Sequence, residues 1–143
     1  MTTTTDTTTT LEDRRAAVLA LHAASAADDW ETVLAGFHPD VVWENDPGAG
    51  PWAGRFEGVD AIATMFTEYL AFLEGTFTSE VLDVCVSPER SASLVVERAT
   101  KAGHVFENRA VWIWRFEDDL IVEVTTVDLD RDQALAFWAS VTP

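Results

Sequence analysis

The first half of the chain has the spacing of apolar residues that is typical of amphipathic helices. Apolar side chains recur at intervals of three and four residues from Trp30 to Phe37, and again from about residue 59 to residue 73. This spacing places them on one side of a helix. An Ala- and Leu-rich segment at about 11–27 precedes both. Thr9 and Asp28 are each followed three residues later by a glutamate, the spacing of a helix-capping box. The pattern predicts three helices.

The second half changes to the alternation that is typical of strands. Short turn sequences separate four such runs, and the segment VVWE predicts one further strand before the third helix. The predicted strands cover about 41–44, 76–87, 92–101, 104–116 and 120–128. Asp130 is positioned to cap a short C-terminal helix. Helices followed by a run of strands predict an α+β fold, with helices packed on one face of a curved antiparallel sheet.

Length, charge and cysteine content limit the possible functions. The 143 residues, 48% of them apolar, are expected to form one domain over 9–143 after a flexible Thr-rich tail at 1–8. A net charge of −16 argues against binding to nucleic acid or to an anionic membrane, because phosphate contacts need Lys and Arg. No apolar run reaches membrane-spanning length and no secretory signal is apparent, so we expect a cytoplasmic protein.

The residues that usually hold metals or cofactors are sparse. Cys85 is the single cysteine, which excludes an internal disulfide, and its alternating β-rich surroundings predict that it is buried and inert. His22, His38 and His104 are scattered without the spacing of a metal site. No glycine-rich phosphate loop follows a strand. We therefore expect neither a metal nor a cofactor.

The segment WENDPGAGPWAGRFEG, at 43–58, mixes acids, tryptophans and turn-forming residues. It is too rich in Gly and Pro for a helix and too apolar for an ordinary solvated loop. Together with the predicted element order, three stretches resemble the nuclear transport factor 2-like superfamily. These stretches are DDWETVLAGFHPDVVWENDPGAGPWAGRFEGVDAI, VWIWRFEDDLIVEV and VDLD. The superfamily includes ketosteroid isomerases, SnoaL-like polyketide cyclases, scytalone dehydratase and limonene epoxide hydrolase.

This resemblance covers about residues 10–140 and implies a cone-shaped sheet, with the three helices of the N-terminal half on its concave face. The cone would enclose a mostly apolar cavity, and segment 43–58 would cross its mouth. Tryptophans would wall the cavity and acids would point at the bound molecule. The same fold hosts many reactions and some members without any.

The resemblance also implies a general base near the end of the first strand. Counted without a gap, the family's base position falls on Asn45, whereas a one-residue insertion places Asp46 there. Partial desolvation beside Trp43 and Trp52 would make Asp46 a better base. The alternative is that Asp46 is a turn residue before a proline. Glu44 should face away from Asn45 and is the weaker candidate.

Two further residues are candidates for polarising or reprotonating a substrate. The family places a hydrogen-bonding group near His22, where a neutral imidazole could donate to an oxyanion or act as a base. Alternation puts Asp128 on the same side as Thr126 and Val124, and SnoaL-like members often carry an aspartate here. The structural alternatives are a core histidine with a satisfied partner and an ordinary strand-end residue.

The strand expected at 104–116 has two distinct faces. Asn108, Ala110, Trp112 and Trp114 share one of them. The second acid of steroid isomerases falls at Trp112, which argues against that oxyanion hole and favours a flat aromatic wall. An ordinary core is the alternative. The residues expected to bind substrate are Trp43, Asn45, Trp52, Phe66, Asn108, Trp112 and Trp114.

The opposite face of that strand carries Glu107 and Arg109, and Glu97 and Arg98 alternate in the same way on the preceding strand. We expect this face to form a homodimer contact. The spacing of Glu107 and Arg109 also leaves open a water-activating acid-arginine set, as in epoxide hydrolases, although a second acid is not evident.

Two classes of function follow. The first is a cofactor-independent acid/base enzyme, an isomerase, cyclase or dehydratase, that acts on a hydrophobic, polyketide- or steroid-like molecule through Asp46, His22 and Asp128. The second is a non-catalytic ligand-binding or dimerisation module of the same fold. Convergence of the three polar residues in one cavity would favour the enzyme, and a cone filled by tryptophans would favour the module.

Overall fold

The computed structural model describes residues 10–143, so the predicted tail at 1–8 and the predicted cap Thr9 lie outside it. Four α-helices, a short 3-10 segment and six strands follow one another along this part of the chain. In order they are α1 (Leu11–Ala26), α2 (Trp30–Ala35), β1 (Phe37–Asn45), η2 (Pro47–Trp52), β2 (Gly54–Glu57), α3 (Val59–Phe72), β3 (Thr78–Val86), β4 (Arg90–Lys101), β5 (His104–Glu117), β6 (Leu120–Asp128) and α4 (Arg131–Val141).

The capping residues of the first two helices lie one position later than the sequence pattern predicted. Thr10 caps α1, because its side chain accepts a hydrogen bond from the backbone of Asp13 at 3.0 Å. Asp29 caps α2 by accepting one from the backbone of Thr32 at 3.3 Å. Each cap has an identical residue directly before it in the chain. Two neighbouring positions therefore offer the same side chain, and the packing of the helix decides between them.

The six strands form one sheet in the order β2-β1-β6-β5-β4-β3. The α+β class with a curved sheet is confirmed, but one pairing departs from the expected antiparallel arrangement, because β1 and β6 run parallel. The long connection from β1 to β6 contains the other long strands and α3, so local sequence gives no sign of this pairing. Strand β2, which the sequence analysis missed, pairs with β1 at the edge of the sheet.

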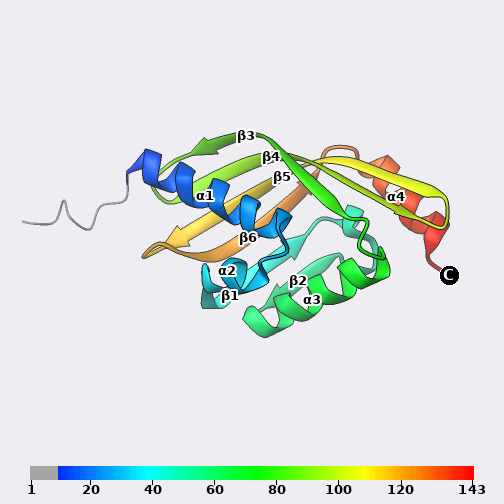
Figure 1. Cartoon of the computed structure of the whole chain (residues 1–143), viewed down its shortest axis with the longest axis horizontal. Helices are drawn as coiled ribbons and strands as arrows, with labels where there is room; N and C mark the ends of the chain where they lie inside the picture. The colour runs from blue at the N-terminus through cyan, green and yellow to red at the C-terminus, as the bar shows by residue number, and fades with distance from the viewer. Residues whose placement is uncertain (1–9) are drawn as a thin grey trace, which may run out of the picture.

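Helices α1, α2 and α3 lie along one face of the sheet, and α4 lies at its other end (Figure 1). Helix α1 packs against β3 and β4, and α3 packs against β1 and β2, while α4 covers β5 and η2 at the other end. The larger core cluster, which includes Val18, Ile62 and Val124, lies under α1 and α3. A second cluster around Phe106 and Trp138 holds α4. The sheet therefore packs against helices at two places, and the site lies between them.

Two local features complete the fold. Ala102 and Gly103 both have positive φ, 50° and 82°, and form the tight hairpin expected between β4 and β5. Cys85 is exposed on β3, which corrects the expectation that it is buried. Its neighbour Val84 takes the inward position on this edge strand, so alternation turns Cys85 outward. No helix within residues 10–143 is both long and apolar enough to cross a bilayer.

Candidate functional site

A cavity of about 350 Å³ lies between the helices and the inner face of the sheet. Its volume is within the range of about 300–1,000 Å³ that is usual for small-molecule sites. Eight large aromatic side chains line it: Trp30, Phe37, Trp43, Phe66, Tyr69, Phe77, Trp112 and Trp114. Their rings pack edge to face, as in the contacts of Trp43 with Phe66 and with Trp112 at centroid distances of 4.8 and 6.0 Å. The tryptophans form walls around an open volume and do not fill it.

The exposed residues of the lining mark the opening. They are Ala26, the last residue of α1, Asp28 in the turn after it, Gly75 after α3, and Thr78, the first residue of β3. Segment 43–58 instead supplies wall, through residues that include Trp43, Asn45 and the buried Gly48. The structure therefore places this part of the segment in the wall of the cavity.

Trp43 and Asn45 are bonded to each other at the end of β1. The indole Nε1 of Trp43 donates to Asn45 Oδ1 at 2.7 Å, and Asn45 Nδ2 donates to the carbonyl of Trp52 at 2.8 Å. Trp52 itself does not line the cavity. Its ring packs against Trp138 at 5.9 Å in the second core cluster, so its glycine-rich segment folds back onto α4.

Two carboxyl groups meet at the cavity through one amide. Asn108 is fully buried, and its Nδ2 donates to Glu97 Oε1 at 3.0 Å and to Asp128 Oδ1 at 2.8 Å. Asn108 Oδ1 accepts from the backbone of Asp130 at 3.3 Å, which orients the amide nitrogen toward the two acids. Glu97 also accepts from Trp112 Nε1 at 3.1 Å. Glu97 and Asp128 line the cavity, whereas Asn108, expected to bind substrate, lies behind them.

Both acids are shifted toward their neutral forms. Burial raises the pKa of Glu97 from 4.5 to about 7, with a further contribution from the charge of Asp128, against the hydrogen bonds from Asn108 and Trp112. Burial also raises the pKa of Asp128, and the nearby Asp46 carboxylate adds to the rise. Within residues 10–143 no donor reaches Asp128 Oδ2. This oxygen lies against Gly48, where an added Cβ would come within 2.0 Å of it.

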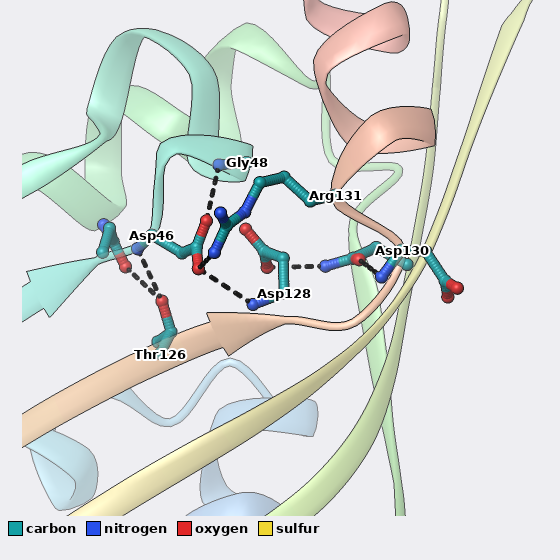
Figure 2. Close-up of polar contacts among 8 residues, drawn as sticks. Asp46, Gly48, Thr126, Asp128, Asp130 and Arg131 are labelled. Carbon is teal, nitrogen blue, oxygen red and sulfur yellow. Dashed lines mark hydrogen bonds and ion pairs between the residues drawn. The ribbon is translucent and has the colours of Figure 1, made fainter.

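Asp46 lies beside Asp128 (Figure 2). It does not line the cavity. Its Oδ1 accepts a hydrogen bond from the backbone of Gly48 at 3.2 Å, as expected of a turn residue before a proline. Its Oδ2 accepts one from Arg131 at 2.6 Å. Burial alone would raise the pKa of Asp46, but the hydrogen bonds from Arg131, Gly48 and the Asp128 backbone lower it. Asp46 is buried as expected, but its pKa is lowered, so the expectation that it is a better base is corrected.

His22 reaches the cavity from α1 as a neutral imidazole. Its Nε2 lies 2.8 Å from Ser93 Oγ, and the same oxygen accepts from Trp114 Nε1 at 3.1 Å. Burial lowers the pKa of His22 from 6.5 to about 4. The side chain lines the cavity and is also hydrogen-bonded to Ser93. Both hypotheses from the sequence, a cavity residue and a core histidine with a partner, therefore describe part of its environment.

Tyr69 is a lining residue of α3 that the sequence analysis placed only in the helix. Burial raises the pKa of its phenol, and the charges of Glu97 and Asp128 raise it further. The hydroxyl therefore stays protonated and close to both acids. Phe66, one turn earlier on α3, lines the cavity as expected and stacks on Trp30 at 5.2 Å.

The outer face of the sheet carries most of the charged residues that the sequence placed on the outward side of strands β4 and β5. Arg109 binds Asp130 at 2.8 Å, and Arg98 binds Glu107 at 3.0 Å. Glu97 does not belong to this face, because it pairs across the strands with the buried Asn108. Asp130 takes the predicted cap position of α4, but its carboxylate serves Arg109 and makes no capping hydrogen bond.

The side chains that usually bind metals do not gather into a metal site in the described part of the fold either. Within residues 10–143 no three His, Cys, Asp or Glu side chains converge as a metal site requires.

The sequence profile of the SnoaL-like domain matches residues 18–124, which is most of the chain. This protein belongs to the SnoaL-like family. No curated protein shows significant similarity to this SnoaL-like chain.

Solved structures share the fold of this SnoaL-like protein. Bal32a, from a soil-derived mobile gene cassette, is 22% identical with a TM-score of 0.83, covering 90% of this chain and 98% of its own. A Xanthomonas campestris protein of unknown function with a cystatin-like fold is 27% identical with a TM-score of 0.78, covering 85% and 95%. TerC, co-crystallised with polyporic acid, is 21% identical with a TM-score of 0.75, covering 86% and 95%. Nuclear transport factor 2-like proteins from Burkholderia species, 23% and 18% identical, also share this fold.

Glu97 is the site residue that sequence reasoning assigned to the wrong face. The signal that could have found it is the cross-strand register. A tight hairpin at Ala102 and Gly103 pairs Lys101 with His104, and counting back along both strands pairs Glu97 with Asn108. The alternation of β5 already placed Asn108 on the inner face, so Glu97 had to follow it.

Proposed function

We propose that this SnoaL-like chain is a cofactor-independent acid/base enzyme, an isomerase, cyclase or dehydratase for a hydrophobic, polyketide- or steroid-like molecule. The observation that carries the proposal is the pair of carboxyl groups of Glu97 and Asp128 in one aromatic cavity, joined by the amide nitrogen of Asn108. Two coupled carboxyl groups release their protons in separate steps. Repulsion between the two groups opposes the build-up of two full negative charges. At neutral pH one carboxylate of such a pair is therefore a better proton acceptor than an isolated carboxylate.

The proposed reaction is a proton transfer next to a carbonyl or at a hydroxyl. Glu97, with a pKa of about 7, takes the proton, and the electron pair of the broken bond moves to the substrate oxygen. Return of the proton to another atom completes an isomerisation, and its delivery to a departing hydroxyl completes a dehydration. A base with a pKa near the working pH is the most effective for such transfers.

Neutral donors around the acids would stabilise the developing negative charge. The protonated phenol of Tyr69 and the neutral imidazole of His22 line the same cavity. Preorganised donors in a dry site stabilise an oxyanion more than water does. We assign this donor role to Tyr69 and His22, and we assign Asp128 the return of a proton to the substrate. Asp46, in contrast, would hold Arg131 and the turn at Gly48 in place.

Hydrogen-deuterium exchange at the α-carbons of a panel of apolar ketones tests the proposal. The protein should accelerate exchange over buffer, and Glu97→Gln should reduce that acceleration at least about 100-fold, the scale of general-base catalysis. Glu31→Gln, which changes an exposed acid on α2, serves as the matched control. Equal exchange in Glu97→Gln and the wild type would remove Glu97 from the mechanism. Ligand binding without any exchange would support the binding-module alternative.

Water activation is a second candidate, and one arrangement favours it. Arg131 donates to Asp46 at 2.6 Å, and its charge also acts on the Asp128 carboxyl. This is an acid-arginine-acid set, although Arg131 does not line the cavity. Hydrolysis of hydrophobic epoxides that is lost in Arg131→Ala but kept in Glu97→Gln would favour this function over proton abstraction.

We also propose that the outer face of the sheet forms a homodimer contact. Val105 and Ile113 are 72% and 37% exposed, on the strand whose outward charges pair with neighbouring residues. Light scattering coupled to size-exclusion chromatography should give twice the monomer mass, and Ile113→Lys should give the monomer. A monomeric wild type would refute this contact.

A further inference from the structure

The charged side chains that line the cavity are all acidic. Within the described residues they are Asp28 at the opening and Glu97 and Asp128 inside. No Lys or Arg of residues 10–143 joins them. Arg131 is the guanidinium close to Asp128, but it donates to Asp46 and does not reach the lining. An anionic group in this cavity would meet no opposite charge.

Three of the four tryptophans that line the cavity already use their ring N–H groups within the protein. The indole Nε1 atoms of Trp43, Trp112 and Trp114 donate to Asn45, Glu97 and Ser93, at 2.7, 3.1 and 3.1 Å. The amide nitrogen of Asn45 is likewise bonded to a backbone carbonyl. A ligand carboxylate, sulfonate or phosphate needs several donors and an opposite charge once water is removed. The Tyr69 hydroxyl and the His22 imidazole also line the cavity, but both are neutral, so they do not supply that charge.

The inner end of the cavity instead offers hydrogen-bond acceptors. The carboxyl oxygens of Glu97 lie at the cavity surface, between the Trp112 indole and Asn108. A hydroxyl group of a ligand donates to such an oxygen without bringing charge into the site. The aromatic walls would take the apolar rings, because stacked and edge-on aromatic contacts add to the burial of area.

We infer that the cavity selects an uncharged, hydroxyl-bearing ring system and rejects ring systems that carry a fixed negative charge. This inference rests on the proposed function only in placing the ligand in the same cavity. It adds that the substrate presents its hydroxyl to Glu97 and carries no carboxylate, sulfonate or phosphate when it enters.

Calorimetric titration with four naphthalenes tests the inference. Naphthalene-2-sulfonamide and naphthalene-2-sulfonate match in size and differ in charge, and 2-naphthol and 2-methoxynaphthalene differ in the hydroxyl donor. The sulfonamide should bind at least about tenfold more tightly than the sulfonate, and the naphthol more tightly than the ether by a few-fold, on the scale of one hydrogen bond. Equal or tighter binding of the sulfonate would overturn the inference, and so would a failure of all four compounds to bind.

Substitution of the inner acids separates the effect of their negative charge from the effect of the shape of the cavity. Glu97→Gln keeps the size of the side chain and removes the inner charge, so it should narrow the ratio between sulfonamide and sulfonate several-fold. Asp128→Asn should act in the same direction, and Glu31→Gln should leave the ratio unchanged. An unchanged ratio in both folded inner variants would overturn the assignment to these acids.

The outcome is distinguishable from that of the exchange experiment. The expected binding order without exchange at carbon would keep the charge selection and refute the catalytic proposal. Exchange on anionic ketones as fast as on neutral ones would refute the charge selection and keep the catalysis.

Discussion

The buried carboxyl of Glu97 should make stability depend on pH in the direction opposite to that of an ordinary ion-paired acid. Its pKa rises from 4.5 to about 7 on folding. Between these values the unfolded chain has released the proton and the folded chain keeps it, so the free energy of unfolding falls as pH rises. At about 1.4 kcal/mol per pKa unit, the loss approaches about 3 kcal/mol near pH 7 and is constant above it.

We expect Glu97→Gln to remove this loss, because glutamine has a similar shape and stays neutral. The variant and the wild type should differ little at pH 4.5, and the variant should gain on the wild type by up to about 3 kcal/mol above pH 7. Such a change is a large part of the stability of a domain, which is typically about 5–15 kcal/mol.

The assay is urea unfolding followed by tryptophan fluorescence across this pH range. The wild-type profile alone does not isolate the effect, because His22 acts in the opposite sense. The pKa of His22 falls from 6.5 to about 4, so its contribution to stability is lost as pH falls below 6.5. The difference between variant and wild type cancels that contribution, and Glu31→Gln serves as the control. A difference that stays constant from pH 4.5 to above 7 would refute the reasoning.

Three further outcomes are expected. Gly48→Ala places a Cβ 2.0 Å from Asp128 Oδ2, so it should cost about 1–3 kcal/mol in chemical unfolding and weaken naphthol binding; unchanged binding would contradict the placement of Asp128. Arg131→Ala should destabilise the protein at neutral pH, because it removes the partner of a buried carboxylate. The lowered pKa of Asp46 means that this difference should shrink as pH falls through 3.8, and a pH-independent difference in unfolding would argue against the ion pair. The imidazole of His22 should titrate in NMR with a midpoint of about 4, and a midpoint of 6.5 would show that it is solvated.

The sequence by itself determined the kinds and order of most elements. Apolar spacing identified α2 and α3, and alternation identified β3 to β6, because these periods follow from the geometry of a single helix or strand. Composition and a capping pattern identified α1. Alternation also placed Asn108, Trp112 and Trp114 on one buried face. The short β2 has no such signal, since four residues beside glycines show no clear period.

Only the tertiary structure decided which acids share the cavity. Asp46 and Asp128 look alike in the sequence, each being an aspartate at the end of a strand. The parallel pairing of β1 with β6 brings them together, and Arg131 from the following helix then binds Asp46 and leaves Asp128 facing Asn108. Charge and burial depend on contacts between residues far apart in the chain. The local sequence therefore carried the fold class, while the pairing of strands assigned the proton-carrying residues.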